Sequence, residues 1–151
     1  MAFKSCTLDS LYAIRWGREP ELGDVQLYAS EINAARIAQG RAPVGLFIMP
    51  QDSQIPSDAF RKEQAARLPE ILANLDFAVA VFEGGGFKQA IMRSALGAIL
   101  LLAPKRFAIH VRSSVTEALL DNPPKPLRFN AALAIDELKR RHIIADSKDV
   151  P

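Results

Sequence analysis

The residues of this chain best suited to chemistry are an acid and three glycines that follow one apolar run. Residues 77–82 are continuously apolar, and they lead directly into Glu83, Gly84, Gly85 and Gly86. Glycines between a strand and a helix let backbone N–H groups approach a phosphate at the positive end of the helix. The segment therefore suggests two chemistries: an anion-binding turn, and a carboxylate that acts as a base at a strand end.

Both chemistries have a simpler competitor. The turn lacks the spaced Gly-x-Gly-x-x-Gly of dinucleotide folds and the Gly-Lys-Ser/Thr of a P-loop, and Glu83 sets a negative charge beside any bound phosphate, which Lys88 offsets in part. Three glycines also suit a tight turn with positive φ and no ligand. Glu83, without a partner group in the sequence, is most simply a solvated side chain near a helix N-terminus.

The remaining nucleophiles and metal ligands form no constellation. His110 lies in an apolar segment, His142 lies in a basic helix end, and Cys6 stands alone, so no zinc-site spacing is present. No Gly-x-Ser-x-Gly sequence accompanies any serine, which leaves a hydrolase triad without an anchor. We therefore expect no enzymatic activity, no metal and no cofactor.

Composition indicates one globular domain. The chain has 151 residues, 49% apolar and 24% charged, which excludes disordered and collagen-like classes. Nineteen Lys and Arg against seventeen Asp and Glu leave a net charge of +2, far from the concentrated positive field of nucleic-acid binding proteins. We expect no nucleic-acid partner.

The same counts bear on the compartment. One cysteine permits no internal disulfide, which is typical of a reducing environment. The first residues contain no apolar stretch of signal-peptide length. The longest helix-like apolar run, residues 95–103, falls short of the ~20 residues that a membrane span requires. We expect a cytoplasmic protein without a membrane span.

Hydrophobic periodicity predicts an α/β fold in which an N-terminal β-hairpin precedes alternating helices and strands, in the order ββαβαβαβα. Pro69 interrupts the second helical pattern, which predicts either one kinked helix or two short helices meeting near Leu68. The expected elements are two strands within 7–17, a helix from Val25 to Gly40, a strand over 44–49, a helix capped by Ser57, a strand over 77–82, a helix up to Leu102, a strand over 107–111, a short helix over 114–120 and a last helix capped by Asn130.

The C-terminal part is expected to be an addition to the same domain. Residues 1–122 form the α/β domain, and residues 123–151 form a proline-rich linker and a helix. Ile135 and Leu138 should face inward, and the basic group 139–141 outward, either as a solvated helix end or as a contact for an acidic partner. The pattern leaves open whether this helix packs on its own subunit or on a neighbour, as in a swapped dimer.

Two further features bear on protein contacts. Trp16 ends the predicted hairpin and either packs in the core or anchors an interface, because tryptophan is common in binding hot spots. Apolar residues, Ile99 and Leu100 among them, surround most of the third predicted helix. Part of that surface should be covered by the C-terminal helix and part by another protein chain, which includes the case of a homodimer.

The opening hairpin, the alternating helices and strands, and the segment Phe-Ala-Ile-His-Val-Arg-Ser-Ser-Val-Thr-Glu-Ala-Leu-Leu at 107–120 together resemble the STAS and SpoIIAA-like domains. The resemblance covers residues 7–120 and implies the fold of anti-sigma-factor antagonists and related regulatory modules. In members switched by phosphorylation, Asp-Ser-Ser/Thr-Gly lies between a buried strand and the next helix. The matching stretch is 50–54, where Asp52 and Ser53 agree and the second hydroxyl and the glycine are absent. The resemblance thus implies Ser53 as the position of a phosphosite.

The sequence therefore predicts a non-catalytic regulatory or protein–protein interaction module of the STAS/SpoIIAA-like type. The alternative is a small-ligand or nucleotide-binding protein that uses the turn at 84–86. A third interpretation is a small enzyme built around Glu83, which needs a second titratable group within hydrogen-bonding distance of that carboxylate.

Overall fold

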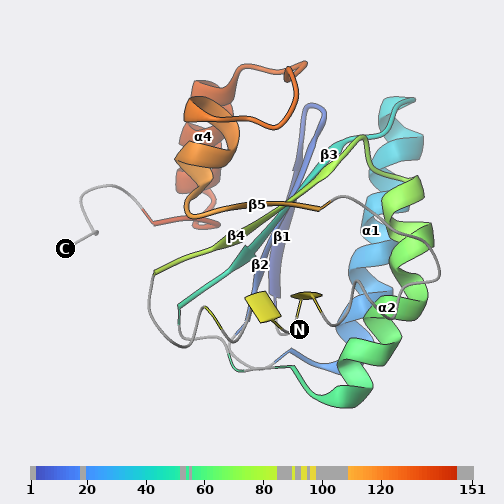
Figure 1. Cartoon of the computed structure of the whole chain (residues 1–151). Coiled ribbons are helices and arrows are strands. Elements are labelled where there is room, and N and C mark those ends of the chain that lie inside the picture. Colours follow the sequence, from blue (N-terminus) through green and yellow to red (C-terminus); the bar gives the residue numbers. More distant parts are fainter. Residues whose placement is uncertain are drawn as a thin grey trace.

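The core of the protein is a five-stranded mixed sheet with the strands in chain order (Figure 1). The computed structural model describes residues 3–17, 20–51, 54, 56–84, 90, 93–94, 96–97 and 109–145. The strands are β1 (Phe3–Leu8), β2 (Leu11–Trp16), β3 (Val44–Met49), β4 (Ala78–Phe82) and β5 (Ile109–Arg112). β1 is antiparallel to β2, and the pairs from β2 to β5 are parallel. The predicted α/β class and N-terminal hairpin are confirmed.

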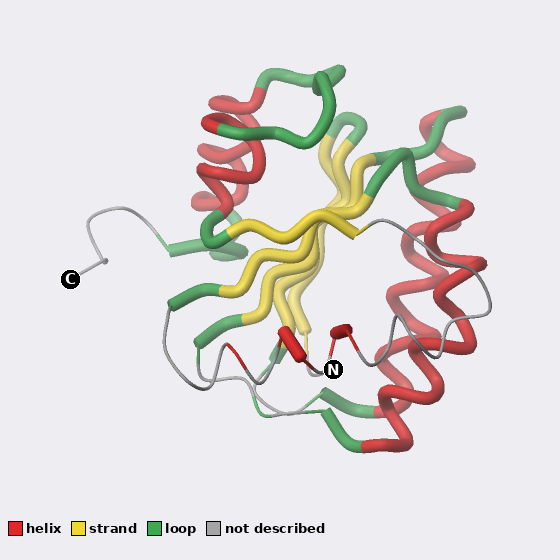
Figure 2. Tube along the Cα trace, viewed as in Figure 1, coloured by secondary structure: helices red, strands yellow, loops and turns green. Residues whose placement is uncertain are grey.

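Helices lie on both faces of the sheet, so the molecule has three layers (Figure 2). The helices are α1 (Leu22–Gln39), α2 (Asp58–Ala73), the π-helix η1 (Glu117–Asp121) and α4 (Ala131–Arg140). α1 and α2 lie together on one side of the sheet, and α4 lies on the other (Figure 1). Residues 90, 93–94 and 96–97 are also helical, and the rest of the predicted third helix lies outside the described residues.

The face under α1 and α2 holds an aromatic core. Trp16 contacts the rings of Phe3, Tyr28 and Phe60 edge to face, with centroids 6.2, 5.2 and 5.5 Å apart. Its side chain is 5% exposed, so the packing interpretation of Trp16 holds. Such a buried ring has little surface left with which to anchor a partner.

The opposite face is covered by η1 and α4. Ile135 and Leu138 are 6% and 0% exposed, and they pack with the sheet residues Leu46 and Val79 in one apolar cluster. The inward positions predicted for the last helix are therefore confirmed. α4 packs on the sheet of its own chain.

Pro69 lies within α2, which continues through it as one helix. A proline in a helix interior removes a hydrogen bond and costs about 3 kcal/mol. Leu68 and Ile71, on either side of it, are 5% and 2% exposed, and their burial against the sheet and α1 offsets this cost. The expectation of two short helices is wrong for this reason.

The helix ends follow local sequence signals. The Ser57 hydroxyl accepts from the Phe60 N–H (3.1 Å), as predicted, and the Asn130 side chain caps α4 in the same way. In the segment that leads into η1, Ser114 Oγ accepts from the Glu117 N–H, and the Glu117 carboxylate accepts from the Ser113 N–H.

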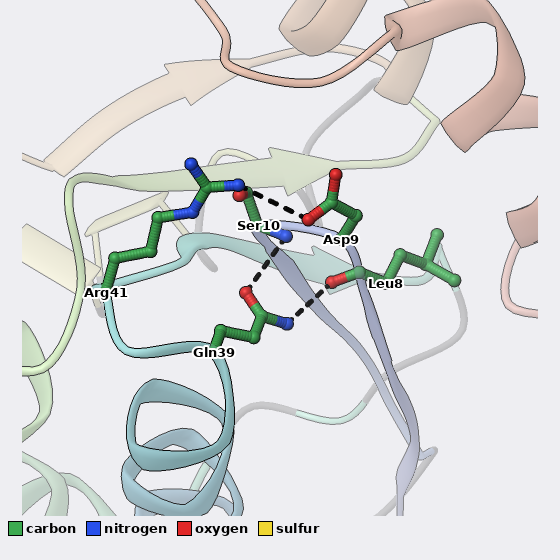
Figure 3. Close-up of polar contacts among 5 residues, drawn as sticks. All are labelled: Leu8, Asp9, Ser10, Gln39 and Arg41. Atoms are coloured by element: carbon green, nitrogen blue, oxygen red, sulfur yellow. Dashed lines mark hydrogen bonds and ion pairs between the residues drawn. The ribbon is translucent and has the colours of Figure 1, made fainter.

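The last turn of α1 holds the hairpin turn in place (Figure 3). Gln39 Nε2 donates to the Leu8 carbonyl, and Gln39 Oε1 accepts from the Ser10 N–H, both at 3.0 Å. Arg41 adds an ion pair to Asp9 at 3.3 Å. Ser10 is 3% exposed, so solvent does not reach its backbone N–H. The Gln39 side chain supplies the hydrogen-bond acceptor for that N–H instead.

Gln39→Ala is expected to lower the free energy of unfolding by about 1–3 kcal/mol, because it leaves backbone groups of the turn without partners. Urea unfolding of the full chain measures this loss. Gln26→Ala, an exposed position on the same helix, is the control and should change stability by less than about 0.5 kcal/mol. Equal losses in the two variants would contradict the bridging role of Gln39.

Leu138→Ala is expected to lower the free energy of unfolding by about 2–5 kcal/mol, because it opens a cavity between α4 and the sheet. Leu133→Ala lies on the same helix at a side chain that is 66% exposed, and it should cost less than about 0.5 kcal/mol. Thermal and urea unfolding compare the two variants. A small loss for both would mean that α4 does not stabilise the sheet.

Candidate functional site

Chemistry-bearing residues gather at the carboxyl edge of the sheet. Because β2 to β5 are parallel, their carboxyl ends lie at one edge, the usual place for ligand sites in open α/β sheets. Arg15 lies near the end of β2, Glu83 directly follows β4, and Ser113 directly follows β5. Residues nearly 100 positions apart in the chain thus meet at this edge.

Strand alternation brings Arg15 and Glu83 together. Leu11 and Ala13 of β2 face the layer of α4, as does Val81 of β4, so the side chains two positions beyond Ala13 and Val81 share that face. The Arg15 guanidinium and the Glu83 carboxylate form an ion pair across β3, and their side chains are 28% and 27% exposed. Arg15 Nη1 also donates to the Ile143 carbonyl at 3.5 Å.

A groove lies beside this pair, between the sheet edge and the chain that follows α4. We call it the carboxyl-edge groove, and it consists of two hollows of about 800 and 290 Å³ that share Lys139, Ile144 and Ala145. The larger hollow is also lined by Arg15, Asp136, Arg140, His142 and Ile143. The smaller one is also lined by Glu83, Gly84, Ser113, Ser114, Val115 and Thr116.

Only some of the charged side chains around the groove form ion pairs within the described part of the chain. Arg140 and Arg141 both bind Glu137, at 3.0 and 2.9 Å, and the hydrogen bond from Arg141, with the charge of Arg140, holds the pKa of Glu137 below its usual range. Within the part of the chain that the structure describes, no hydrogen bond or ion pair engages the side chains of Lys139 and His142. Lys139 therefore offers a positive charge to an incoming group, in a groove that the carboxylate of Asp136 also lines.

Gly84 forms the turn that the sequence led us to expect. Its φ is +75°, and an added Cβ would meet the Gln51 side chain at 2.6 Å. The Glu83 N–H donates to the Met49 carbonyl at 3.0 Å, which ties the turn to the end of β3. Gly84 thus serves the turn itself. Gly85, Gly86 and Lys88 lie outside the described residues.

The other candidates that the structure describes, His110 and Cys6, do not line the groove. His110 is half-buried, its ring lies 6.2 Å from Phe77, and desolvation, with the charges of Arg112 and Lys125, lowers its pKa. Cys6 packs against the α4 core, where burial raises the pKa of its thiol. Ser53, Ile99 and Leu100 lie outside the described residues. Among those described, no three His, Cys, Asp or Glu side chains gather to hold a metal.

Sequence reasoning missed Arg15 as a partner of Glu83. The available signal was one charge near the end of an otherwise apolar strand, in the alternation set of Leu11 and Ala13. It also treated the basic group 139–141 as one unit, whereas the structure divides it into two arginines that bind Glu137 and a lysine that lines the groove. Both distinctions depend on contacts between distant segments.

Fold and site together define an α/β protein with a charged groove at the carboxyl edge of its sheet. Comparisons of the chain with family models, curated proteins and solved structures found no match. None of the helices in the described part of the chain has the length and apolar character to cross a membrane. The function is therefore inferred from the geometry of the groove.

Gly84→Ala is expected to lower the free energy of unfolding by about 1–2 kcal/mol, because a left-handed backbone strains any residue with a Cβ. The exposed Gln51 side chain can move aside, so φ imposes most of the cost. Gly23→Ala is the matched control: it lies in α1 with open space around it and should stabilise by up to about 1 kcal/mol. Stabilisation by both substitutions in urea unfolding would contradict a required turn at Gly84.

Proposed function

We propose that the protein is a non-catalytic regulatory or protein–protein interaction module of the STAS/SpoIIAA-like type, and that it engages its partner at the carboxyl-edge groove. The ion pair between Arg15 and Glu83 carries this proposal. A general base must exchange protons near neutral pH, whereas a guanidinium stays protonated throughout that range. Arg15 therefore does not supply the second titratable group that an enzyme built around Glu83 needs, and the ion pair holds the guanidinium beside the groove.

The order of elements supports the family type. The resemblance rests on a hairpin followed by alternating helices and strands, and β1 to β5 follow that order with α1 and α2 in the connections. The segment 107–120, which carries the closest likeness in sequence, includes β5 and most of η1. Both observations support the proposal, because the segments that carry the resemblance include strands of the sheet beside the groove.

The lining of the groove suits a protein segment. Small-molecule sites are mostly apolar with a few placed polar groups. The larger hollow here is lined mainly by charged side chains, and its apolar members Ile143 and Ile144 are only 2% and 9% exposed. A hollow of about 800 Å³ with a polar rim can accept an extended peptide that makes hydrogen bonds and ion pairs along its length.

One observation favours the alternative of a small ligand. The smaller hollow is lined by three hydroxyl residues, Ser113, Ser114 and Thr116, together with Lys139 and Gly84. Hydroxyls and an ammonium group suit a small anion. In this alternative a small anion binds in the smaller hollow, and the larger hollow has no ligand.

Photo-crosslinking distinguishes the two functions. A crosslinking residue in place of Ala145, which is exposed and lines both hollows, is expected to join the full chain to a protein when it is expressed in its source cells. The same residue in place of Ala34, exposed on α1 at the opposite face, should give no such product.

Intact-mass analysis of the products decides between the outcomes. An adduct of small-molecule mass at position 145 would support the ligand alternative and contradict the module. Protein adducts of equal yield at both positions, or none at position 145, would also contradict the proposed use of the groove.

A further inference from the structure

We infer that the partner segment received by the carboxyl-edge groove is an acidic peptide, anchored at Lys139 and Arg15. This inference rests on the proposed function, because it names the chemistry of the partner at that same site. Lys139 is placed to be the central contact, since it lines both hollows.

The chemistry of Lys139 follows from its neighbours. Arg140 and Arg141 share the one carboxylate of Glu137. Lys139 is half-buried at the edge of the groove, and within the described residues its ammonium group has no carboxylate or carbonyl partner. A carboxylate would give this ammonium group both a charge partner and hydrogen bonds. The groove thus has a site for an acidic side chain at its centre.

Arg15 supplies the second anchor. Its guanidinium has five N–H donors, and its contacts to Glu83 and to the Ile143 carbonyl both use Nη1. The remaining donors can bind a second carboxylate while Glu83 stays in place. Since Arg15 lines the larger hollow and Lys139 lines both, an extended peptide with separated acids can reach both cations.

The acids of the groove favour a peptide over a nucleic acid. Asp136 lines the larger hollow among several cations, and Glu83 lines the smaller one with Lys139, so each half carries both signs of charge. A phosphate backbone brings uniform negative charge, which those carboxylates repel, and the chain's net charge of +2 gives little field to compensate. A peptide offers backbone N–H donors to the same carboxylates and can alternate acidic with neutral residues.

Fluorescence anisotropy on the full chain tests the inference. The probe is a short fluorescein-labelled peptide in which glutamates alternate with glycine and serine, and its matched control has glutamine at every glutamate. We expect binding of the acidic peptide, no measurable binding of the glutamine peptide, and an affinity that falls as NaCl is raised, because exposed charges are screened.

Two charge reversals locate the contact. Lys139→Glu is expected to weaken binding of the acidic peptide by about three- to tenfold, since it replaces an attraction by a repulsion. Lys62→Glu makes the same change at an exposed position of α2, on the opposite face, and should leave the affinity unchanged. Lys139→Gln, which adds no charge near the helix end, should give a smaller loss in the same direction, with circular dichroism confirming the fold of all three variants.

The inference is overturned if the glutamine peptide binds as well as the acidic one, or if Lys62→Glu weakens binding as much as Lys139→Glu. Tighter binding of a labelled single-stranded oligonucleotide would assign the groove to nucleic acid and overturn it too. Protein crosslinks at position 145 without binding of the acidic peptide would contradict the acidic partner and leave the proposed function standing. If neither crosslinks nor peptide binding were found, the proposed function would be contradicted as well.

Discussion

The constraint on which this structure depends is the apolar character of its central strands on both faces. β4 is buried along its whole length, and β3 has buried side chains on one face and the half-buried Phe47 and Met49 on the other, so both strands need cover on both faces. A parallel sheet of this kind is stable only with a helical layer on each face. α1 and α2 supply one layer, and η1 and α4 supply the other, which makes the C-terminal helix a necessary part of the core.

The groove is a consequence of that cover. α4 lies across the sheet with its C-terminal end at the carboxyl edge, because Ile135, Leu138 and Ile143 all pack into the same cluster. The chain leaving α4 therefore passes beside the strand ends and forms a wall there. The packing that buries the sheet thus also brings Lys139 and His142 to the place where Arg15 and Glu83 meet.

Electrostatics divides the residues of this edge into two roles. Glu83 and Glu137 neutralise arginines on the same molecule, and these pairs orient side chains around the groove. Lys139, which lines both hollows, has no such partner in the described part of the chain. Exposed ion pairs contribute little to stability, so this arrangement matters more for what the groove attracts than for how firmly the fold holds together.

Local patterns in the sequence were enough to predict the hairpin, the apolar strands, the caps at Ser57 and Asn130 and the inward face of α4. Each of these depends on neighbours a few positions away, where periodicity and capping act. At Pro69 the sequence left open one kinked helix or two short helices, because the choice between them depends on packing that the sequence does not display.

The tertiary structure alone decided that Arg15 pairs with Glu83. It also decided that Arg140 and Arg141 bind Glu137 while Lys139 lines the groove. Strand order, and the path of α4 over the sheet, determine which distant charges meet. The sequence by itself therefore determined the elements and their buried faces. Only the assembled sheet and its two helical layers decided where a charged groove forms, because a contact between remote segments depends on how those layers pack.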